Sequence, residues 1–258
     1  MRRFTLTLIA LALCAPFGAR AQTPKKTSVL IFSGQNNHNW RLTTPNLRSI
    51  LEQSGRFDCR VIEDLTAVGP ELLAKYDLLL SDYNGERIGA RFEQALTDYV
   101  ESGKGLVIVH AANNAFNGWD EYDKMIGAAW RAGTYHPAFG KYDVTVINRE
   151  HPITAGLKSF ETTDEMYCNM LPHAASKATI LATSIAPSGV VAGKVQPMAL
   201  VVEYGKGRVF HTPLGHVGNE AQLVSQRGAG FQTLLLRGAE WAATGRVTIP
   251  VPDALKEN

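Results

Sequence analysis

The segment of residues 105–114, GLVIVHAANN, constrains the possible folds more than any other part of this chain. Its apolar first half is typical of a strand that is buried on both faces of a parallel sheet. The strand ends at His110, and ligands of open α/β sheets bind outside the carboxyl ends of the strands. In hydrolases and amidotransferases, the turn after such a strand carries a Ser or Cys nucleophile. Here Ala111 and Ala112 follow the histidine, so the scaffold is typical of an enzyme but lacks the usual nucleophile.

Strand patterns alternate with amphipathic helices throughout the first half of the chain. The expected strands cover residues 28–33, 57–63, 77–81 and 105–109. A first helix is expected with Thr44 as its N-cap and Pro45 in its first position. A second is expected over residues 92–100, with Gly103 ending the segment. This alternation predicts a flavodoxin-like, doubly wound, mostly parallel sheet with helices on both faces.

The pattern changes in the second half of the chain. Residues 113–140 are rich in Asn, Gly and aromatic residues, with one short helical stretch at 120–125. Long irregular loops in compact domains are commonly binding loops or lids, and we expect this one to cover the crevice. A hairpin turn is expected at residues 205–207, and a closing helix over residues 231–241. The further strands are expected over residues 142–147, 179–183, 198–204 and 208–212.

Residues 1–21 have the features of a cleavable signal peptide. Two arginines precede a mostly apolar stretch, and Ala19-Arg-Ala21 supplies a small-x-small cleavage pattern. The apolar stretch is shorter than the ~20 residues of a membrane span, and no second long apolar segment follows. A lipid anchor on Cys14 is the less favoured alternative, because a bulky Leu precedes it. We therefore expect one α/β domain over residues 22–258, without a membrane span, that is periplasmic or secreted.

The charge of the chain argues against a nucleic-acid partner. Removal of residues 1–21 takes away three arginines and no acidic residue, so the formal charge of +2 becomes −1. Nucleic-acid binding needs a clustered basic face, and this balance does not predict one. A small-molecule partner is the remaining expectation.

Several Cys and His residues are expected to be structural. Cys59 alternates with apolar neighbours in an expected strand, so burial explains it better than a disulfide with Cys168, although export would permit that bond. Neither cysteine is expected to be a nucleophile, and no CxxC spacing indicates structural zinc. His151 is expected to shape a turn before a short helix. His173 and His211 are assigned no functional role.

Five residues lie at expected strand ends or in loops where chemistry is expected, namely His38, His110, His136, Glu165 and His216. If the first and fourth strands are near neighbours, His38 and His110 converge on one crevice. Two or three histidines with a carboxylate can bind Zn²⁺ or another divalent metal, although no HExxH or comparable spacing is present. The alternative is metal-free acid–base catalysis by the histidines and Glu165.

Aromatic and amide side chains are candidates for binding a sugar. Aromatic faces stack on the apolar face of a sugar ring, and amides hydrogen-bond its hydroxyls. The substrate-binding candidates are Asn37, Asn113, Trp130 and Tyr135. The alternative is that the aromatic residues of the 113–140 loop only pack this loop onto the core.

The order and spacing of several short motifs resemble the trehalose-utilisation, ThuA-like family from about residue 28 to 241. These motifs include GKGLVIVH at 103–110, the segment 127–136, HPIT at 151–154, DEMY at 164–167 and the LGH that ends at His216. The resemblance implies a fold like that of class I glutamine amidotransferases without their Cys-His-Glu machinery. It also implies a link to carbohydrate catabolism, including steps on 3-keto sugars and glycosides. His211 departs from the pattern, which has an aromatic residue there.

Two functions follow from the residues and the resemblance. The first is an exported enzyme that acts on a glycoside or keto sugar by acid–base or metal-assisted elimination or hydrolysis, with any metal held by the five candidate residues. The second is a non-catalytic sugar-binding module on an inactive amidotransferase-like scaffold. The first function is favoured.

Overall fold

Five parallel strands form the half of the sheet that bears most of the candidate residues. The computed structural model describes residues 25–257, and its nine-stranded sheet has the order β2-β1-β3-β4-β11-β10-β9-β6-β7. The first five are parallel. Helical connections join β1 to β2, β2 to β3 and β3 to β4, whereas β11 follows β10 through a hairpin. Their bounds are β2 Phe57–Ile62, β1 Thr27–Phe32, β3 Leu78–Ser81, β4 Gly105–Val109 and β11 Gly207–Thr212. The predicted α/β class with a flavodoxin-like arrangement is confirmed.

Four antiparallel strands extend this sheet. They are β10 Val195–Tyr204, β9 Ala178–Ile185, β6 Gly140–Val146 and β7 Phe160–Asp164. The short strands β5 Ala128–Ala129 and β8 Leu171–Pro172 pair separately. Each predicted strand is present with bounds that differ by a few residues, and the predicted hairpin joins β10 to β11. Strand β7 was not predicted, because its sequence FETTD carries too little apolar alternation.

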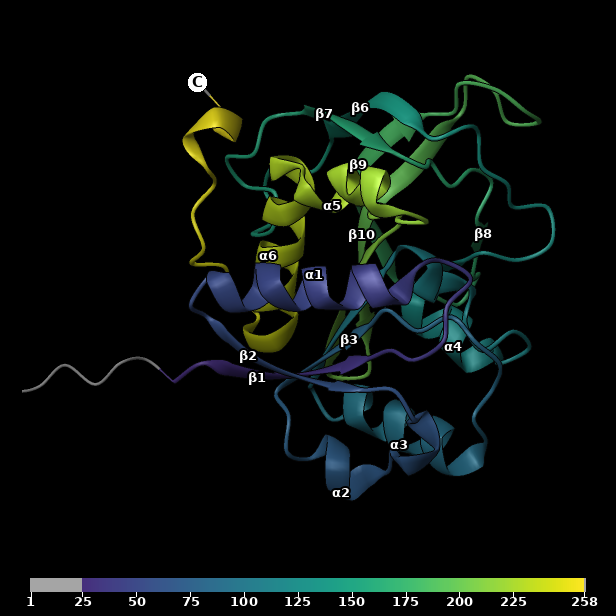
Figure 1. The fold of residues 1–258 in the computed structure, drawn as a ribbon, viewed down its shortest axis with the longest axis vertical. Helices are drawn as coiled ribbons and strands as arrows, with labels where there is room; N and C mark the ends of the chain where they lie inside the picture. Colours follow the sequence, from purple (N-terminus) through teal and green to yellow (C-terminus); the bar gives the residue numbers. More distant parts are fainter. Residues whose placement is uncertain (1–24, 258) are drawn as a thin grey trace, which may run out of the picture.

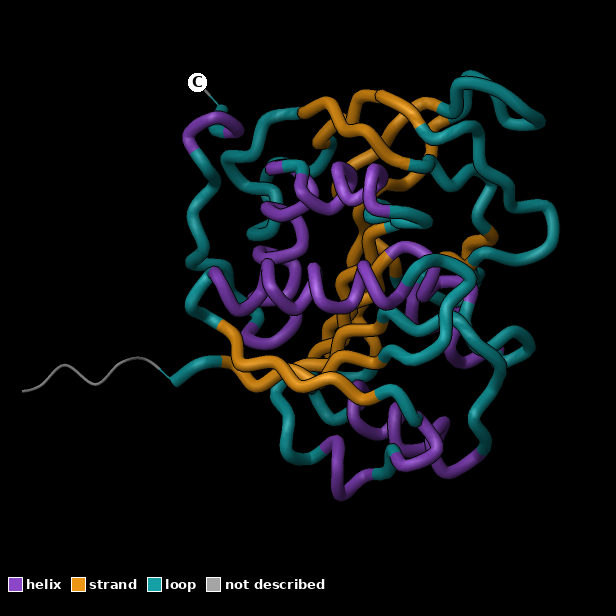
Figure 2. Tube along the Cα trace, in the orientation of Figure 1, coloured by secondary structure: helices purple, strands orange, loops and turns teal. Residues whose placement is uncertain are grey.

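Helices cover both faces of the sheet, as predicted (Figures 1 and 2). The α1 and α6 helices pack on one face with the side chains of Val29 and Ile31, while α3 packs on the other face with Leu30 and Phe32. Successive strand residues point to opposite faces, so β1 serves both cores. The helices are α1 Trp40–Gln53, α2 Pro70–Leu73, α3 Ala90–Glu101, α4 Asp120–Ile126, α5 Val224–Arg227 and α6 Ala229–Thr244. The 3₁₀ turns are η1 Leu65–Ala67, η2 His110–Asn114, η3 Glu220–Leu223 and η4 Asp253–Leu255.

The start of α1 differs from the prediction. The helix begins at Trp40, so Thr44 is not its N-cap and Pro45 lies inside the helix. The Thr44 hydroxyl instead donates to the buried carboxylate of Asp82 at 2.5 Å. This long-range contact anchors α1 to the segment that follows β3, and the local sequence does not reveal it.

Both cysteines of the described chain are free and buried. Cys59 lies inside β2, as predicted, and burial raises the pKa of its thiol to about 12. Burial also raises the pKa of Cys168 to about 11. The disulfide that export would permit is therefore absent from this structure, and neither thiol has the lowered pKa of a reactive cysteine.

His211 is a fully buried, neutral histidine of β11. Its Nδ1 donates to the carbonyl of Ile126 at 3.0 Å, and its Nε2 accepts from the amide of Asn113 at 3.2 Å. Burial lowers the pKa of His211 to about 4. These contacts give the ring a packing role, in line with the structural assignment. Among the other structural histidines, His151 forms a turn whose Nδ1 accepts from Ile153, but no helix follows it.

We expect His211 to make folding sensitive to acid. The pKa of its imidazole is 6.5 in an ordinary setting and about 4 in the folded protein, so stability is complete above about 6.5 and falls as the pH drops through this window. The loss attributable to His211 should reach up to about 3 kcal/mol. Urea unfolding at about pH 7 and about pH 4.5 should show a smaller pH-dependent loss for His211→Gln than for wild type. Equal losses in the two proteins would contradict this account.

None of the helices in residues 25–257 is long and apolar enough to cross a bilayer. The expected signal peptide, residues 1–21, lies outside the described residues.

Candidate functional site

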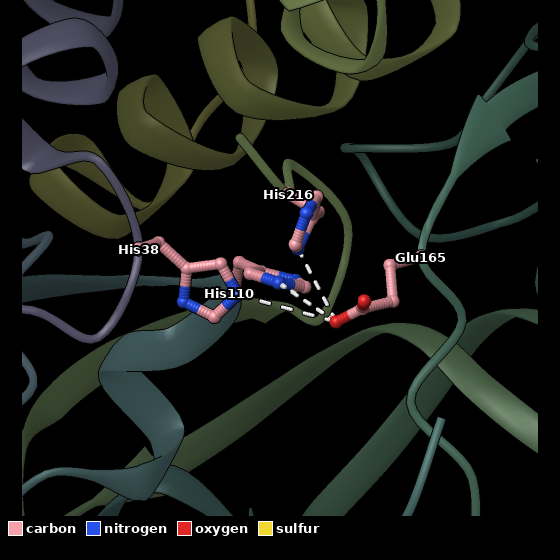
Figure 3. Close-up of side chains that lie close together, drawn as sticks. All are labelled: His38, His110, Glu165 and His216. Atoms are coloured by element: carbon pink, nitrogen blue, oxygen red, sulfur yellow. Dashed lines mark ion pairs between the residues drawn. The ribbon is translucent and has the colours of Figure 1, made fainter. Parts of the chain in front are cut away.

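Three histidines from the carboxyl ends of three parallel strands meet at one edge of the sheet (Figure 3). His38 lies in the loop after β1, His110 directly follows β4, and His216 lies in the loop after β11. The ring centroids of His38 lie 4.8 Å from His110 and 4.6 Å from His216. His38 and His110 were predicted to converge on one crevice at this edge. The structure confirms that the two rings converge, although only His38 also lines the adjoining cavity.

His110 occupies the position at which related scaffolds carry a nucleophile. Its φ is +45°, a left-handed conformation that costs free energy for a residue with a Cβ. His110 and the two small residues that follow it, Ala111 and Ala112, are all buried. The ring of Tyr167 stacks on His110 with centroids 4.1 Å apart and fixes the plane of the imidazole.

Glu165 reaches the histidines from the antiparallel half of the sheet, directly after β7 (Figure 3). Its Oε1 lies 3.2 Å from Nδ1 of His216 and 4.0 Å from Nε2 of both His38 and His110. Its other oxygen, Oε2, lies 3.0 Å from Nδ1 of His136 in the 113–140 loop. One buried carboxylate thus contacts all four candidate histidines.

The outer nitrogens of His110 and His216 are bound to oxygen acceptors. Nδ1 of His110 donates to the carbonyl of Pro213 at 2.6 Å. Nε2 of His216 lies 3.2 Å from Oε1 of Gln222, which also accepts from the backbone N–H of Gly218 and is therefore oriented as an acceptor. Within the described chain, the inner nitrogen of His110, Nε2, has no hydrogen-bond partner, and the inner nitrogen of His216, Nδ1, faces the Glu165 carboxylate at 3.2 Å. In the neutral rings these inner nitrogens carry lone pairs.

His38 is held in the same way by two amides. Its Nδ1 lies 3.0 Å from Oδ1 of Asn37 and 3.2 Å from Oδ1 of Asn36. Asn36 donates its own N–H to the carbonyl of Asp82, and Asn84 donates to Asn37, so both oxygens are fixed as acceptors. Nε2 of His38 therefore presents a lone pair to the cluster. Metal-ligating histidines characteristically donate their other ring nitrogen to such an oxygen.

These four side chains could hold a divalent metal ion. One ligand atom from each of His38, His110, Glu165 and His216 lies within 4.8 Å of all the others. Ligand atoms of a tetrahedral zinc, at ~2.0–2.1 Å from the ion, lie about 3.4 Å from one another. The observed set is slightly wider, and nitrogen with carboxylate oxygen suits zinc and neighbouring divalent metals.

The electrostatics of the cluster favour a neutral His110 and an ionised Glu165. Burial, reinforced by His38 and His216, lowers the pKa of His110 well below its ordinary value. Burial alone would raise the pKa of Glu165, but contacts with His216 and His38 hold it below its ordinary value. Burial likewise opposes protonation of His216, whose pKa is nevertheless raised by the Glu165 carboxylate. A neutral imidazole and an ionised carboxylate are the forms that bind metals.

Asp164 connects the loop that carries His216 to the segment that carries Glu165. It is completely buried, and its carboxylate accepts from the backbone N–H groups of Gly215 at 2.7 Å, His216 at 3.0 Å and Glu165 at 2.8 Å. Burial raises the pKa of Asp164 to about 7, although these N–H groups favour its ionised form. This carboxylate fixes the loop of His216 against the segment of Glu165.

The cluster of histidines and Glu165 adjoins a cavity of about 260 Å³. Trp130, His136 and Tyr167 line it together with Asn114 and Gly218. The ring centroids of Trp130 and Tyr167 lie 4.4 Å apart in an edge-to-face contact. The cavity thus combines aromatic walls with a half-exposed imidazole next to the buried cluster.

Comparison with known proteins identifies the family. The family model ThuA, described as trehalose utilisation, matches residues 28–242. The chain belongs to the ThuA family. A ThuA-like protein from Parabacteroides merdae is 32% identical, with 90% of this chain and 95% of that chain covered and a TM-score of 0.80. The predicted family is therefore confirmed.

Other similarities of this ThuA protein concern the fold. A ThuA-like protein from Bacteroides uniformis is 21% identical, with 90% of this chain and 97% of that chain covered and a TM-score of 0.67. A β-galactosidase from Rahnella sp. R3 is 16% identical, with 90% of this chain but 33% of that chain covered and a TM-score of 0.55. No curated protein matches the sequence.

Two of the predicted substrate-binding residues of this ThuA protein do not line the cavity. Asn113 is fully buried, where its amide contacts His211 and the sulfur of Met170. Tyr135 packs against the core, and its hydroxyl donates to the carbonyl of Ser188. These positions do not support a substrate-binding role for either residue. Assigning a residue to a loop does not show which side of the loop its side chain occupies. Trp130 and Asn37 do line the cavity.

Sequence reasoning missed several residues of the site. Asn84 follows the carboxyl end of β3, so the strand-end argument that selected His38 could also have selected it. Asp164 and Tyr167 belong to the same DEMY motif as Glu165, but nothing in the motif indicates their separate contacts. Gln222 carries no sequence signal, because only the tertiary fold brings it to His216.

The 113–140 loop divides into two parts with different surroundings. Phe116 and Trp119 are buried among the core residues around α3. Trp130 and His136 line the cavity, and Phe139 lies 5.6 Å from the ring of His216. The first part of the loop is therefore core packing, and the later part forms a wall of the site.

Proposed function

We propose that this ThuA-family protein is a metal-dependent enzyme of carbohydrate catabolism that acts on keto sugars or their glycosides. One observation carries the proposal: the lone pairs of His38, His110 and His216 converge with the Glu165 carboxylate, while the outer nitrogen of each ring is bound to an oxygen. Ordinary core packing does not require three imidazoles to be oriented toward one buried carboxylate, nor the inner nitrogen of His110 to lack a hydrogen-bond partner.

A keto group suits the chemistry of this cavity. A bound divalent ion would polarise a carbonyl or hydroxyl oxygen of the sugar. A ketone at C3 acidifies the hydrogen on C2, and a base that removes this proton allows the electron pair to form the C1–C2 double bond as the glycosidic C1–O bond breaks. The leaving oxygen then takes up a proton. His136 lines the cavity and is half-exposed. We therefore assign it as the general acid or base in these proton transfers.

A non-catalytic, sugar-binding role is the second candidate. It is favoured by the presence of four candidate protein ligands for the metal ion. Four protein ligands are typical of closed, structural zinc sites, whereas catalytic sites leave a position open. Glu165 decides between the two roles. Its Oε1 lies 4.0 Å from two of the histidines, and its Oε2 contacts His136. If a metal ion is bound, Glu165 would therefore be the ligand that a substrate oxygen could replace.

Turnover of 3-keto-glucosides with and without EDTA tests the proposed function. We expect the protein to release the aglycone from a 3-keto-glucoside, to lose this activity after dialysis against EDTA, and to regain it with Zn²⁺ or Mn²⁺. Activity that survives complete metal removal would favour the metal-free acid–base mechanism. Metal binding without turnover of any keto-glycoside would favour the binding module.

Substitutions in the cavity separate proton transfer from binding. His136→Ala should lower kcat about 100-fold if His136 acts as acid or base, with little change in metal content. Trp130→Ala should mainly raise KM, because it removes an aromatic wall. Tyr135→Ala is the matched control, since Tyr135 does not line the cavity and should change stability rather than KM. Full activity of His136→Ala would make His136 a structural residue.

Export is part of the same proposal. We propose that residues 1–21 are removed and that residues 22–258 form the mature, periplasmic or secreted protein. The pattern of two arginines, an apolar stretch and Ala19-Arg-Ala21 supports this proposal. Mass spectrometry of the protein from fractionated cells should find a mature N-terminus at Gln22.

A further inference from the structure

A second cavity adjoins the histidine-lined one. It has a volume of about 440 Å³ and lies over the loops that follow β1, β3 and β4. Six amide side chains line it, those of Gln35, Asn36, Asn37, Asn84, Asn114 and Asn117. We call it the amide cavity, and the 260 Å³ cavity with His38, His136 and Trp130 the histidine cavity.

The two cavities share a wall. Asn37, Asn84 and Asn114 line both of them. Asn84 donates to Oδ1 of Asn37 at 2.6 Å, and the same oxygen lies 3.0 Å from Nδ1 of His38. A molecule that extends from one cavity into the other therefore touches the amides that orient a candidate metal ligand.

The lining of the amide cavity is selective. An amide carries both a donor and an acceptor, which matches the hydroxyl groups of a polyol or a sugar. Asn36, Asn37 and Asn84 use part of this capacity for contacts with His38, Asp82 and one another. Among the described residues that line it there is no aromatic ring on which an aryl group could stack, and no Lys or Arg that could hold a phosphate. The only charged lining residue of the described chain is Glu86, which disfavours an anionic ligand.

The histidine cavity by itself is small for a whole substrate. Its 260 Å³ lies below the range of about 300–1,000 Å³ that is common for small-molecule sites, whereas the adjoining 440 Å³ brings the joint site well into that range. The reacting sugar ring accordingly occupies only part of the site.

We propose that the amide cavity is the subsite for the leaving group, and that this leaving group is an uncharged, hydroxyl-rich unit bound by hydrogen bonds rather than by stacking. The proposal rests on the proposed function, because it takes the histidine cavity as the place of the reacting ring. It assigns a specificity to the protein, namely preference for glycosides with a sugar or polyol aglycone over aryl and alkyl glycosides.

Calorimetric binding of unoxidised glucosides to the full-length protein tests this assignment without turnover. The probes are trehalose, maltose and cellobiose, compared with the methyl and phenyl glucosides of matching anomeric configuration. At least one disaccharide should bind about tenfold more tightly than its methyl and phenyl counterparts, which corresponds to one or two additional hydrogen bonds. Asn117→Ala, which alters the amide cavity and not the histidine cavity, should remove most of this preference and leave phenyl glucoside binding unchanged. Gln94→Ala, an exposed amide on α3, is the matched control and should bind as wild type does.

Three results would overturn the assignment. These are phenyl glucosides that bind as tightly as every disaccharide, an Asn117→Ala variant that weakens both ligand classes equally, and the absence of measurable binding of any disaccharide. These readouts do not depend on turnover. Failure of the keto-glycoside assay with preserved disaccharide preference would contradict the proposed chemistry and leave the subsite in place.

Discussion

Replacement of Glu165 by Gln is expected to abolish tight binding of a divalent metal. The carboxylate supplies the only negative charge among the four converging ligands, and its Oε1 lies within 4.0 Å of all three histidines. A neutral amide leaves the ion with imidazoles alone. We expect the affinity for Zn²⁺ to fall by more than about 100-fold, since even groups that only orient metal ligands contribute about 10–100-fold. Calorimetry and the metal content after dialysis against a chelator measure this effect.

A matched substitution on the same segment provides the control. Glu161→Gln removes a carboxylate from the exposed side of β7, where Glu161 pairs with Lys141 at the surface. It should leave metal content and affinity at the wild-type level. If Glu165→Gln retains as much metal as this control, the cluster is not a metal centre, and metal-free acid–base chemistry becomes the better account of the site.

Replacement of Asp164 by Asn is expected to damage both stability and the site. The carboxylate accepts three backbone N–H groups in a fully buried position. The amide nitrogen of Asn cannot accept a hydrogen bond, so at least one buried N–H group loses its partner. We expect a loss of about 2–4 kcal/mol in the free energy of unfolding, measured by urea denaturation. Metal affinity should fall about 10–100-fold as His216 and Glu165 lose their alignment.

Two measurements separate alignment from a general loss of stability. Asp143→Asn, an exposed change on the neighbouring strand β6, should leave both stability and metal affinity unchanged. Metal affinity of Asp164→Asn should be measured at a temperature where far-UV circular dichroism shows the variant to be folded. A folded Asp164→Asn protein with wild-type metal affinity would show that Asp164 supports the fold without positioning the ligands.

Two histidines of the site could be predicted from the local sequence. His38 and His110 follow apolar strands of a recognisable parallel pattern, and the carboxyl ends of such strands meet at one edge. The same argument could have selected Asn84 after β3. The surroundings of Asn113 and Tyr135 could not be predicted in this way, because the position of a residue in a loop does not show which side of the loop its side chain occupies. Asn113 turned inward to His211 and Tyr135 toward Ser188.

The sequence by itself determined the parallel half of the sheet, the helices on its faces and the absence of a nucleophile after β4. These features depend on apolar periodicity and short-range spacing, which are properties of the chain. The tertiary structure alone decided that Glu165, from the antiparallel half, lies among three histidines, that Asp164 and Gln222 orient this cluster, and that Thr44 anchors α1 instead of capping it. The physical reason is that most of the contacts that orient these side chains join residues far apart in the sequence. The hydrophobic pattern of the chain does not show which loop lies next to which strand end.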